Sequence, residues 1–391
     1  MESIVSLLPI REAGRTCILS KRWRYVWASA PSLNITDDTG NINLDLNWSF
    51  IVEQALSLHN GPILDFQLNT RAGQCDLDRW VPLLTRKGLQ KLRLSFDRQV
   101  KKEVNVIILM SYRMHTSLFC CTSLVSLDLS CCSLNPSCDY KGLPSLKFLT
   151  LMRVRLTDSI LESLVSGSGR LEKLVLFNCD GLSHLKIHAS SLSFLFVQAK
   201  FSAINLSKSS NLKAFVVVLH KRDNAFASMT NVLEGLLGLE YFFRGDVPER
   251  LSTTYNYLRF LVLVLNTNKI MEVKGFVCLL RSFPNLEYLT IQVYCHRQLE
   301  SQSDGCFCEN MNCQSGSWLS CLRRVKIRLG EIRLEDMELI KFLLLNTKVL
   351  DKFFIETSKG MDQAIQLSLE KQLLLLPKAS SRAKIILKNS C

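Results

Sequence analysis

A short apolar pattern, L-x-x-L-x-L with conservative replacements, recurs along most of the 391-residue chain. Between Leu124 and Leu212 the successive starts of the pattern lie 22, 25, 21 and 20 residues apart. Later steps vary from 19 to 36 residues, which indicates insertions in the C-terminal half. Such regularity predicts a chain that folds by stacking similar units. The ten starts are Leu89, Leu124, Leu146, Leu171, Leu192, Leu212, Leu239, Leu258, Leu286 and Leu322.

Each unit is expected to form one rung of a parallel sheet. The second and third apolar positions are two residues apart, so both point to one face of a short strand. Stacked strands, such as those holding Leu127, Leu149, Leu174 and Leu195, would share a continuous core. The period resembles that of leucine-rich repeats, which implies an α/β solenoid over about residues 60–330, with a curved parallel sheet and helices or loops on its convex side. An ordinary α/β protein with Leu-rich strands is the alternative, and the in-phase recurrence disfavours it.

The N-terminal residues carry a second recognisable motif. Residues 7–13 read L-L-P-I-R-E-A, and residues 18–27 read I-L-S-K-R-W-R-Y-V-W. These segments closely resemble the second half of a plant F-box, so residues 1–34 are interpreted as a partial F-box. In that family the helices dock on the Skp-type adaptor of a cullin-based ubiquitin ligase. The resemblance assigns adaptor contacts to Leu8, Pro9, Leu19, Arg22 and Trp23.

This partial motif leaves two interpretations open. The family's opening L-P-x-x-[LIV] segment is not found, and only residues 4–8 correspond to the end of its first helix. The smaller apolar surface predicts weak adaptor binding, which a complete F-box would restore. Trp23 and Trp27 are four residues apart and share a helix face. They therefore also fit a purely structural role, capping the end of the repeat stack.

The C-terminal residues 318–391 are similar to the FBD module that accompanies F-boxes and leucine-rich repeats in many plant proteins. The resemblance rests on residues 318–327, 338–344 and 348–353. We expect a strand at 322–328, a helix at about 334–346, a strand at 349–355, then a further helix and an edge strand at 383–387. This module would close the open end of the repeat sheet, which the repeats at residues 60–317 would otherwise expose.

Strand positions that alternate with the core leucines are expected to face outward on the concave side. In the middle repeats these positions are apolar, and such a stripe is typical of a partner site. Toward the ends they are basic, with Lys91 and Arg93 at one end and Arg324, Lys326 and Arg328 at the other. A partner would then present an apolar centre with acidic flanks. The predicted target-binding residues are Phe194, Phe196, Val216, Val218, Phe260, Val262 and Val264.

Other kinds of chemistry find little support in the sequence. The formal net charge of +13 is not concentrated among aromatic residues, which argues against nucleic-acid binding. The apolar runs are too short to span a membrane. The 15 cysteines are irregularly spaced, so we expect free thiols in the cytoplasm or nucleus. Cys306, Cys308 and Cys313, with Cys295 and His296 upstream, fit no common zinc module and are interpreted as a solvated loop. No catalytic residues, metal or other cofactor are expected.

The sequence therefore predicts a binding protein without an active site. The first hypothesis is a substrate-receptor-like subunit of an SCF-type (Skp/cullin/F-box) ubiquitin ligase, which holds an unidentified target protein on the repeat surface. The second is a non-ligase interaction scaffold whose degenerate F-box no longer binds the adaptor. Co-purification with the Skp-type adaptor would separate the two.

Overall fold

The computed structural model of the chain describes residues 5, 8, 10–16, 18–35, 48–71, 76–97, 112–114, 116–135, 142–206, 209–218, 249–251, 254–267, 270–293, 319–330, 334–357 and 370–389. The chain divides into two compact units, an N-terminal unit of Met1–Leu182 and a C-terminal unit of Ser183–Cys391. Each unit is described by itself.

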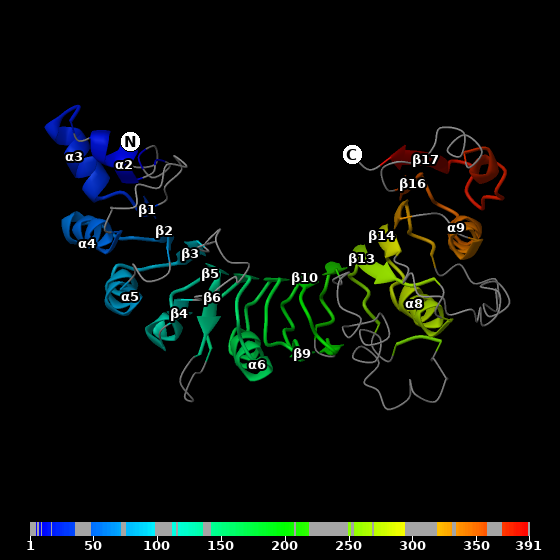
Figure 1. The fold of residues 1–391 in the computed structure, drawn as a ribbon, viewed down its shortest axis with the longest axis horizontal. Helices are drawn as coiled ribbons and strands as arrows, with labels where there is room; N and C mark the ends of the chain where they lie inside the picture. Colours follow the sequence, from blue (N-terminus) through cyan, green and yellow to red (C-terminus); the bar gives the residue numbers. More distant parts are fainter. Residues whose placement is uncertain are drawn as a thin grey trace, which may run out of the picture. The chain divides into compact units, whose positions relative to one another are not determined.

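The N-terminal unit is built on parallel strands. In spatial order they are β1 (Ser32–Ile35), β2 (Asp65–Arg71), β3 (Lys91–Asp97), β5 (Ser126–Ser130), β7 (Phe148–Met152) and β8 (Lys173–Phe177). A short parallel pair accompanies them, formed by β4 (Tyr112–Met114) and β6 (Cys132–Leu134). The helices are α2 (Ile10–Thr16), α3 (Lys21–Ala28), α4 (Trp48–Leu58), α5 (Leu77–Arg86), the 3-10 helix η1 (Thr116–Cys120) and α6 (Asp158–Ser166). Figure 1 shows α4, α5 and α6 on one side of the strands.

The leucine pattern produces the core of this unit. Leu127 on β5 lies in register with Leu149 on β7, which lies in register with Leu174 on β8. All three side chains are at most 1% exposed. The residues between the leucines are partly or fully exposed, as the alternation of a strand requires. The predicted stacking of these rungs is confirmed.

The chain leaves three consecutive strands through the same kind of corner. Cys131, Arg153 and Asn178 directly follow β5, β7 and β8, and their φ angles are 58°, 55° and 52°. This is the left-handed region, which costs a residue with a side chain about 1–2 kcal/mol unless local contacts compensate. Hydrogen bonds between corners do so in part: Cys131 N donates to Met152 O at 2.9 Å, and Arg153 N donates to Phe177 O at 2.7 Å. Stacking therefore stabilises a turn that each repeat alone would resist.

The C-terminal unit continues the same construction. Its parallel strands, in spatial order, are β10 (Phe194–Gln198), β12 (Ala214–Val217), β13 (Phe260–Leu265), β14 (Tyr288–Val293), β15 (Arg324–Leu329), β16 (Lys352–Thr357) and β17 (Lys384–Asn389). A short pair is formed by β9 (His184–Lys186) and β11 (Ala203–Asn205). The long helices are α8 (Ile270–Ser282) and α9 (Leu334–Asn346), and both lie on one side of the strands (Figure 1).

The last strands lie within the residues predicted to form the FBD module. This segment, residues 318–391, supplies β15, β16 and β17, which pair in register after β14. The expected boundary near residue 318 thus falls between two strands that are hydrogen-bonded to each other. Parallel strands also occur outside the expected range of residues 60–330, since β1 precedes it and β16 and β17 follow it. The α9 bounds match the prediction, and β17 is the terminal strand of the order, as the expected edge strand would be.

Candidate partner-binding surfaces

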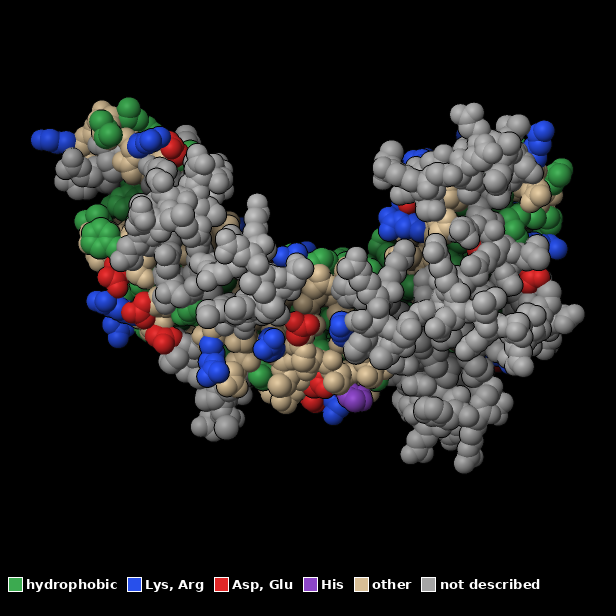
Figure 2. All heavy atoms as spheres, in the orientation of Figure 1, with side chains coloured by type: hydrophobic (Ala, Val, Ile, Leu, Met, Phe, Trp, Pro, Cys, Tyr) green, Lys and Arg blue, Asp and Glu red, His purple; other side chains and the backbone are tan. Residues whose placement is uncertain are grey.

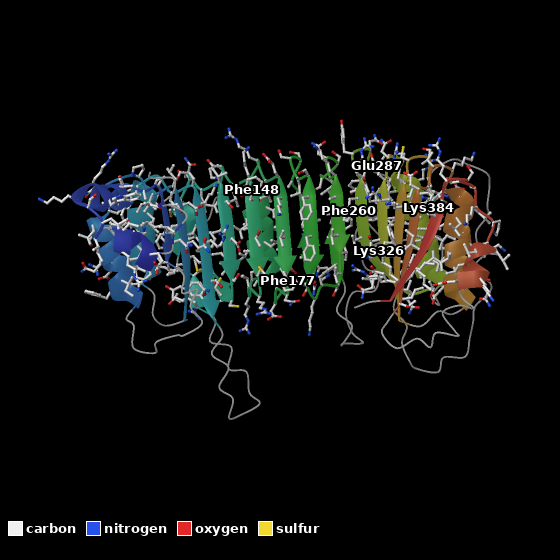
Figure 3. All side chains as sticks on the ribbon, turned by 90° about the horizontal axis from the view of Figure 1, so that it is seen from above. Phe148, Phe177, Phe260, Glu287, Lys326 and Lys384 are labelled. Atoms are coloured by element: carbon white, nitrogen blue, oxygen red, sulfur yellow. The ribbon has the colours of Figure 1, made fainter. Side chains whose placement is uncertain are left out.

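In the C-terminal unit, α8 and α9 lie on one side of the strands. We call the opposite face of these strands the open face. Its side chains fall into rows because every strand is in register with the next. Figure 3 shows Phe260, Lys326 and Lys384 on this face. The first row consists of Phe194, Ala214, Phe260, Tyr288, Arg324, Lys352 and Lys384, and the second of Phe196, Val216, Val262, Thr290, Lys326, Phe354 and Ile386.

The predicted target-binding residues occupy the apolar half of this face. Phe260 retains 37% of its surface, and four others, Phe194, Phe196, Val218 and Val262, are partly exposed. Val216 and Val264, however, are only 8% and 4% exposed and offer little contact area. Alternation along a strand fixes the direction of a side chain, whereas its depth depends on neighbours in other strands. The accessible apolar surface of the open face is therefore formed by the five exposed or partly exposed residues, and Val216 and Val264 add little to it.

The basic half of the open face contains one neutralised cluster. Glu356 on β16 accepts from Lys326 Nζ at 2.6 Å and from Arg328 Nε at 3.0 Å. Burial by itself would raise the pKa of the Glu356 carboxyl, but the two hydrogen-bonded cations outweigh that effect and lower it. Two of the basic residues singled out in the sequence are thus already paired within the protein.

The first row is different, because its cations form no ion pair with a carboxylate in the part of the chain that the structure describes. Arg324 lies over the ring of Tyr288, 5.4 Å from its centroid. Lys352 and Lys384 are exposed and form no ion pair within the described residues. The nearby Glu287 is engaged by Arg259, with Nη1 to Oε1 at 2.9 Å. Figure 2 shows the blue Lys and Arg side chains beside green apolar ones on this unit. Sequence reasoning missed both lysines, although the alternation in K-F-F-I-E-T and K-I-I-L-K-N carries the signal.

A second exposed apolar site lies in the turn between α2 and α3. Ile18 and Leu19 retain 85% and 70% of their surface. Of the residues predicted to contact an adaptor, Leu19 and Arg22 are exposed and Leu8 and Trp23 are partly exposed. Pro9 lies outside the described residues. Sequence reasoning missed Ile18, although it stands next to Leu19 in the same motif.

The opposite side of these helices is structural. Trp27 is 9% exposed, and α2 contacts the terminal strand β1. Backbone hydrogen bonds connect the end of α3 to the segment that precedes β2, since Asn60 N and Gly61 N both donate to Ala28 O, at 2.7 and 3.2 Å. The two tryptophans therefore differ: Trp27 is buried, and Trp23 remains partly accessible.

The described cysteines are free thiols that lie either in the core or closer to the surface. Burial raises the pKa of the Cys132 thiol, and it raises those of Cys179 and Cys278 to about 11 each. Such thiols stay protonated, which disfavours nucleophilic or metal-binding roles. In the described part of the chain no group of His, Cys, Asp and Glu is arranged to hold a metal. The cysteines and histidine of the zinc hypothesis, Cys295 to Cys313, lie outside it. None of the described helices combines the length and apolarity needed to cross a membrane.

Parallel rungs with in-register leucines, left-handed corners and helices on one side define a leucine-rich-repeat protein. Residues 77–291 match the family model described as FBD-associated F-box protein At5g56370, LRR repeats. Because that match covers more than half of the chain, the protein belongs to this family of leucine-rich-repeat, FBD-associated F-box proteins. The predicted resemblance is confirmed.

Relatives from Arabidopsis thaliana match between about half and nearly all of the chain. F-box/FBD/LRR-repeat protein At1g13570 is 29% identical, over 99% of this chain and 95% of the relative. F-box/LRR-repeat protein 13 is 24% identical, over 97% of this chain and 92% of the relative. Probable FBD-associated F-box protein At1g32375 is 30% identical, over 52% of this chain and 48% of the relative. These names point to a protein-interaction role rather than to catalysis.

Proposed function

We propose that this protein is the target-binding subunit of an SCF-type ubiquitin ligase. The turn between α2 and α3 would contact a Skp-type adaptor, and the open face would hold a target protein. The ubiquitin-transfer chemistry would belong to other subunits, so this chain would act by positioning its target.

The observation that carries the proposal is the exposure of Ile18 and Leu19. Two adjacent large aliphatic side chains at 85% and 70% exposure are costly to leave in water. Arg22 is exposed at the start of the following helix, so the apolar pair has a charged neighbour, as interface rims commonly do. The family resemblance independently assigns Leu19 and Arg22 to adaptor contact.

A second candidate function is a scaffold that binds partners without joining a ligase. The contact between α2 and β1, together with the burial of Trp27, favours it, because a cap for the sheet would need these helices even without an adaptor. Under this alternative, Ile18 and Leu19 do not contact an adaptor.

Calorimetry of the purified chain with a Skp-type adaptor distinguishes the candidates. We expect weak binding by the chain as it stands, and tighter binding when a complete F-box opening segment is fused ahead of it. In the fused chain, Ile18→Asp with Leu19→Asp should weaken binding roughly 30-fold or more, as for a central interface anchor. Leu58→Asp, at a 57% exposed position on α4, is the matched control and should change nothing. No binding by the fused chain favours the scaffold. Unaltered adaptor binding by the double variant would contradict the assignment of Ile18 and Leu19 to the adaptor contact.

A further inference from the structure

The first row of the open face changes character along the strand order. It runs from Phe194 and Phe260 through Tyr288 to Arg324, Lys352 and Lys384. The three cations are direct neighbours, with Arg324 opposite Lys352 and Lys352 opposite Lys384. Neighbouring strands lie about 4.8 Å apart, and like charges placed directly opposite each other destabilise a sheet. We call these three residues the basic row.

The two lysines of the basic row differ from the other cations of the open face in their lack of described partners. One register position further along, Lys326 and Arg328 share the carboxylate of Glu356. Lys388, in register with Glu356, lies over the Phe354 ring, 5.4 Å from its centroid. Within the described residues, Lys352 and Lys384 have neither kind of partner. Among the residues that the structure describes, the repulsion between Lys352 and Lys384 is therefore uncompensated, and an anionic ligand would relieve it.

We propose that the open face binds an extended acidic segment of the target protein, whose carboxylates lie along the basic row and whose bulky apolar side chain lies at Phe260. The inference rests on the proposed target-binding function of this face. It specifies the chemistry of the target: acidic residues on one side of the apolar anchor, toward β17, rather than on both.

The spacing of the strands sets the spacing of the ligand. From Phe260 the basic row begins two strands away at Arg324 and ends four strands away at Lys384, which is roughly 10 to 19 Å at about 4.8 Å per strand. An extended peptide advances about 3.3 Å per residue. Carboxylates three to six residues from the apolar anchor would therefore meet the cations.

A protein segment fits this surface better than a nucleic acid. The cations form one row of three, and the same row continues into Tyr288, Phe260 and Phe194. Nucleic-acid affinity depends on neutralising many phosphates, typically along a broad basic patch. An apolar centre with a charged rim is instead the usual composition of a protein interface.

Selection from a random peptide library tests the proposal. Phage displaying random 12-residue peptides would be selected on the purified full-length chain, and enriched peptides would be synthesised for fluorescence polarisation. We expect Asp and Glu three to six positions from a bulky apolar residue. Lys352→Glu with Lys384→Glu should weaken binding about tenfold at low ionic strength, where surface charge pairs are least screened. Lys341→Glu with Lys348→Glu, exposed lysines on α9 and just after it, is the control and should not.

Each other outcome has a defined meaning. Enriched peptides without acidic residues, or peptides indifferent to the Lys352 and Lys384 reversal, overturn the proposal. If those peptides still require Phe260, shown by Phe260→Ala, the target-binding face survives and only the acidic specificity fails. If binding depends on neither Phe260 nor the lysines, or no peptide is enriched, the face itself is wrong. Tighter binding of a 20-nucleotide single-stranded RNA, lost on charge reversal, also overturns it.

Discussion

The two units present different chemistry on the same strand geometry. On the strand face of the N-terminal unit that lies opposite its helices, the described basic side chains Lys91, Arg93 and Lys173 stand among the carboxylates Asp65 and Asp128. On the open face of the C-terminal unit, the described residues include six basic side chains and a single carboxylate, Glu356, which pairs with only two of them. The six are Arg324, Lys326, Arg328, Lys352, Lys384 and Lys388.

The two carboxylates also respond differently to their surroundings. Burial raises the pKa of Asp128, even though Arg93 lies 3.5 Å away and opposes that shift. Burial acts on Glu356 in the same direction, but two cations reverse it. A repeat backbone therefore fixes where a side chain stands, while the residues at alternate positions decide the local charge. The core leucines, which both units share, therefore do not determine which partner the outer side chains can bind.

The largest expected effect tests whether both units depend on the same core. Leu149→Ala in β7 and Leu261→Ala in β13 each remove a side chain no more than 1% exposed. Each should lower the free energy of unfolding by about 2–5 kcal/mol, because a cavity remains. Phe148→Ala and Phe260→Ala, one position earlier and 40% and 37% exposed, should cost much less. Urea denaturation measures all four, and equal losses within either pair would contradict the division between core and outer face.

The next effect concerns the apolar half of the open face. Phe194→Asp combined with Phe260→Asp should abolish capture of selected peptides, since anchors of this kind contribute about 2 kcal/mol or more each. Circular dichroism and the urea midpoint should show that the fold survives. Phe148→Asp, on the N-terminal unit, is the control at a similarly exposed phenylalanine. Unfolding of the double variant would place the two side chains beneath another segment and the binding site elsewhere.

A smaller effect should appear when the neutralised cluster is opened. Glu356→Gln releases Lys326 and Arg328, so acidic peptides should bind about threefold more tightly at low salt. Added salt, at roughly 0.5 M, should remove the gain by screening. Asp128→Asn releases Arg93 in the N-terminal unit and should leave peptide affinity unchanged. Equal gains from the two variants would mean that any free cation suffices and that the basic row has no special role.

The smallest effect sharpens the comparison at the corners. Left-handed residues with side chains follow β5, β7 and β8 in the N-terminal unit, and none occurs among the described residues of the C-terminal unit. Arg153→Gly should raise the free energy of unfolding by about 0.5 kcal/mol, because glycine enters this region without a Cβ clash but costs more backbone entropy. Asn178→Gly should gain less, since asparagine tolerates the conformation. Thermal melts resolve the order, and a loss of stability in Arg153→Gly would show that its side chain compensates the strain.

The parts predicted well from sequence are those governed by local spacing. The rung leucines Leu127, Leu149 and Leu174 were placed in register, and α9 was placed at its observed bounds, because both depend on periodicity within one segment. The depth of Val216 and Val264 could not be obtained in this way. Their burial depends on side chains of neighbouring strands, which the spacing within one segment does not describe.

The basic row shows the same limit for function. Lys352 and Lys384 follow the expected alternation, but their significance appears only when Glu356 is seen to pair with Lys326 and Arg328. That pairing joins β15 to β16 across a helix and a turn, and sequence spacing does not reveal it. Residue types therefore predict a charged end, and the three-dimensional register identifies which of these charges are paired within the described residues.

The ends of the strand order are finished in two different ways. β1 is contacted by a helix, α2, whereas β17 ends the order with the sequence K-I-I-L-K-N. Within the described residues, no strand pairs with the outer edge of β17. A strand edge carrying Ile385, Ile386 and Leu387 is a template for pairing with another copy, and lysines are a common protection against such aggregation. Lys384 and Lys388 flank these three residues and would bring like charges together in any edge-to-edge dimer. Solubility of the free protein and attraction of an acidic partner would then both draw on the ammonium group of Lys384, so a variant that neutralises it is expected to weaken both.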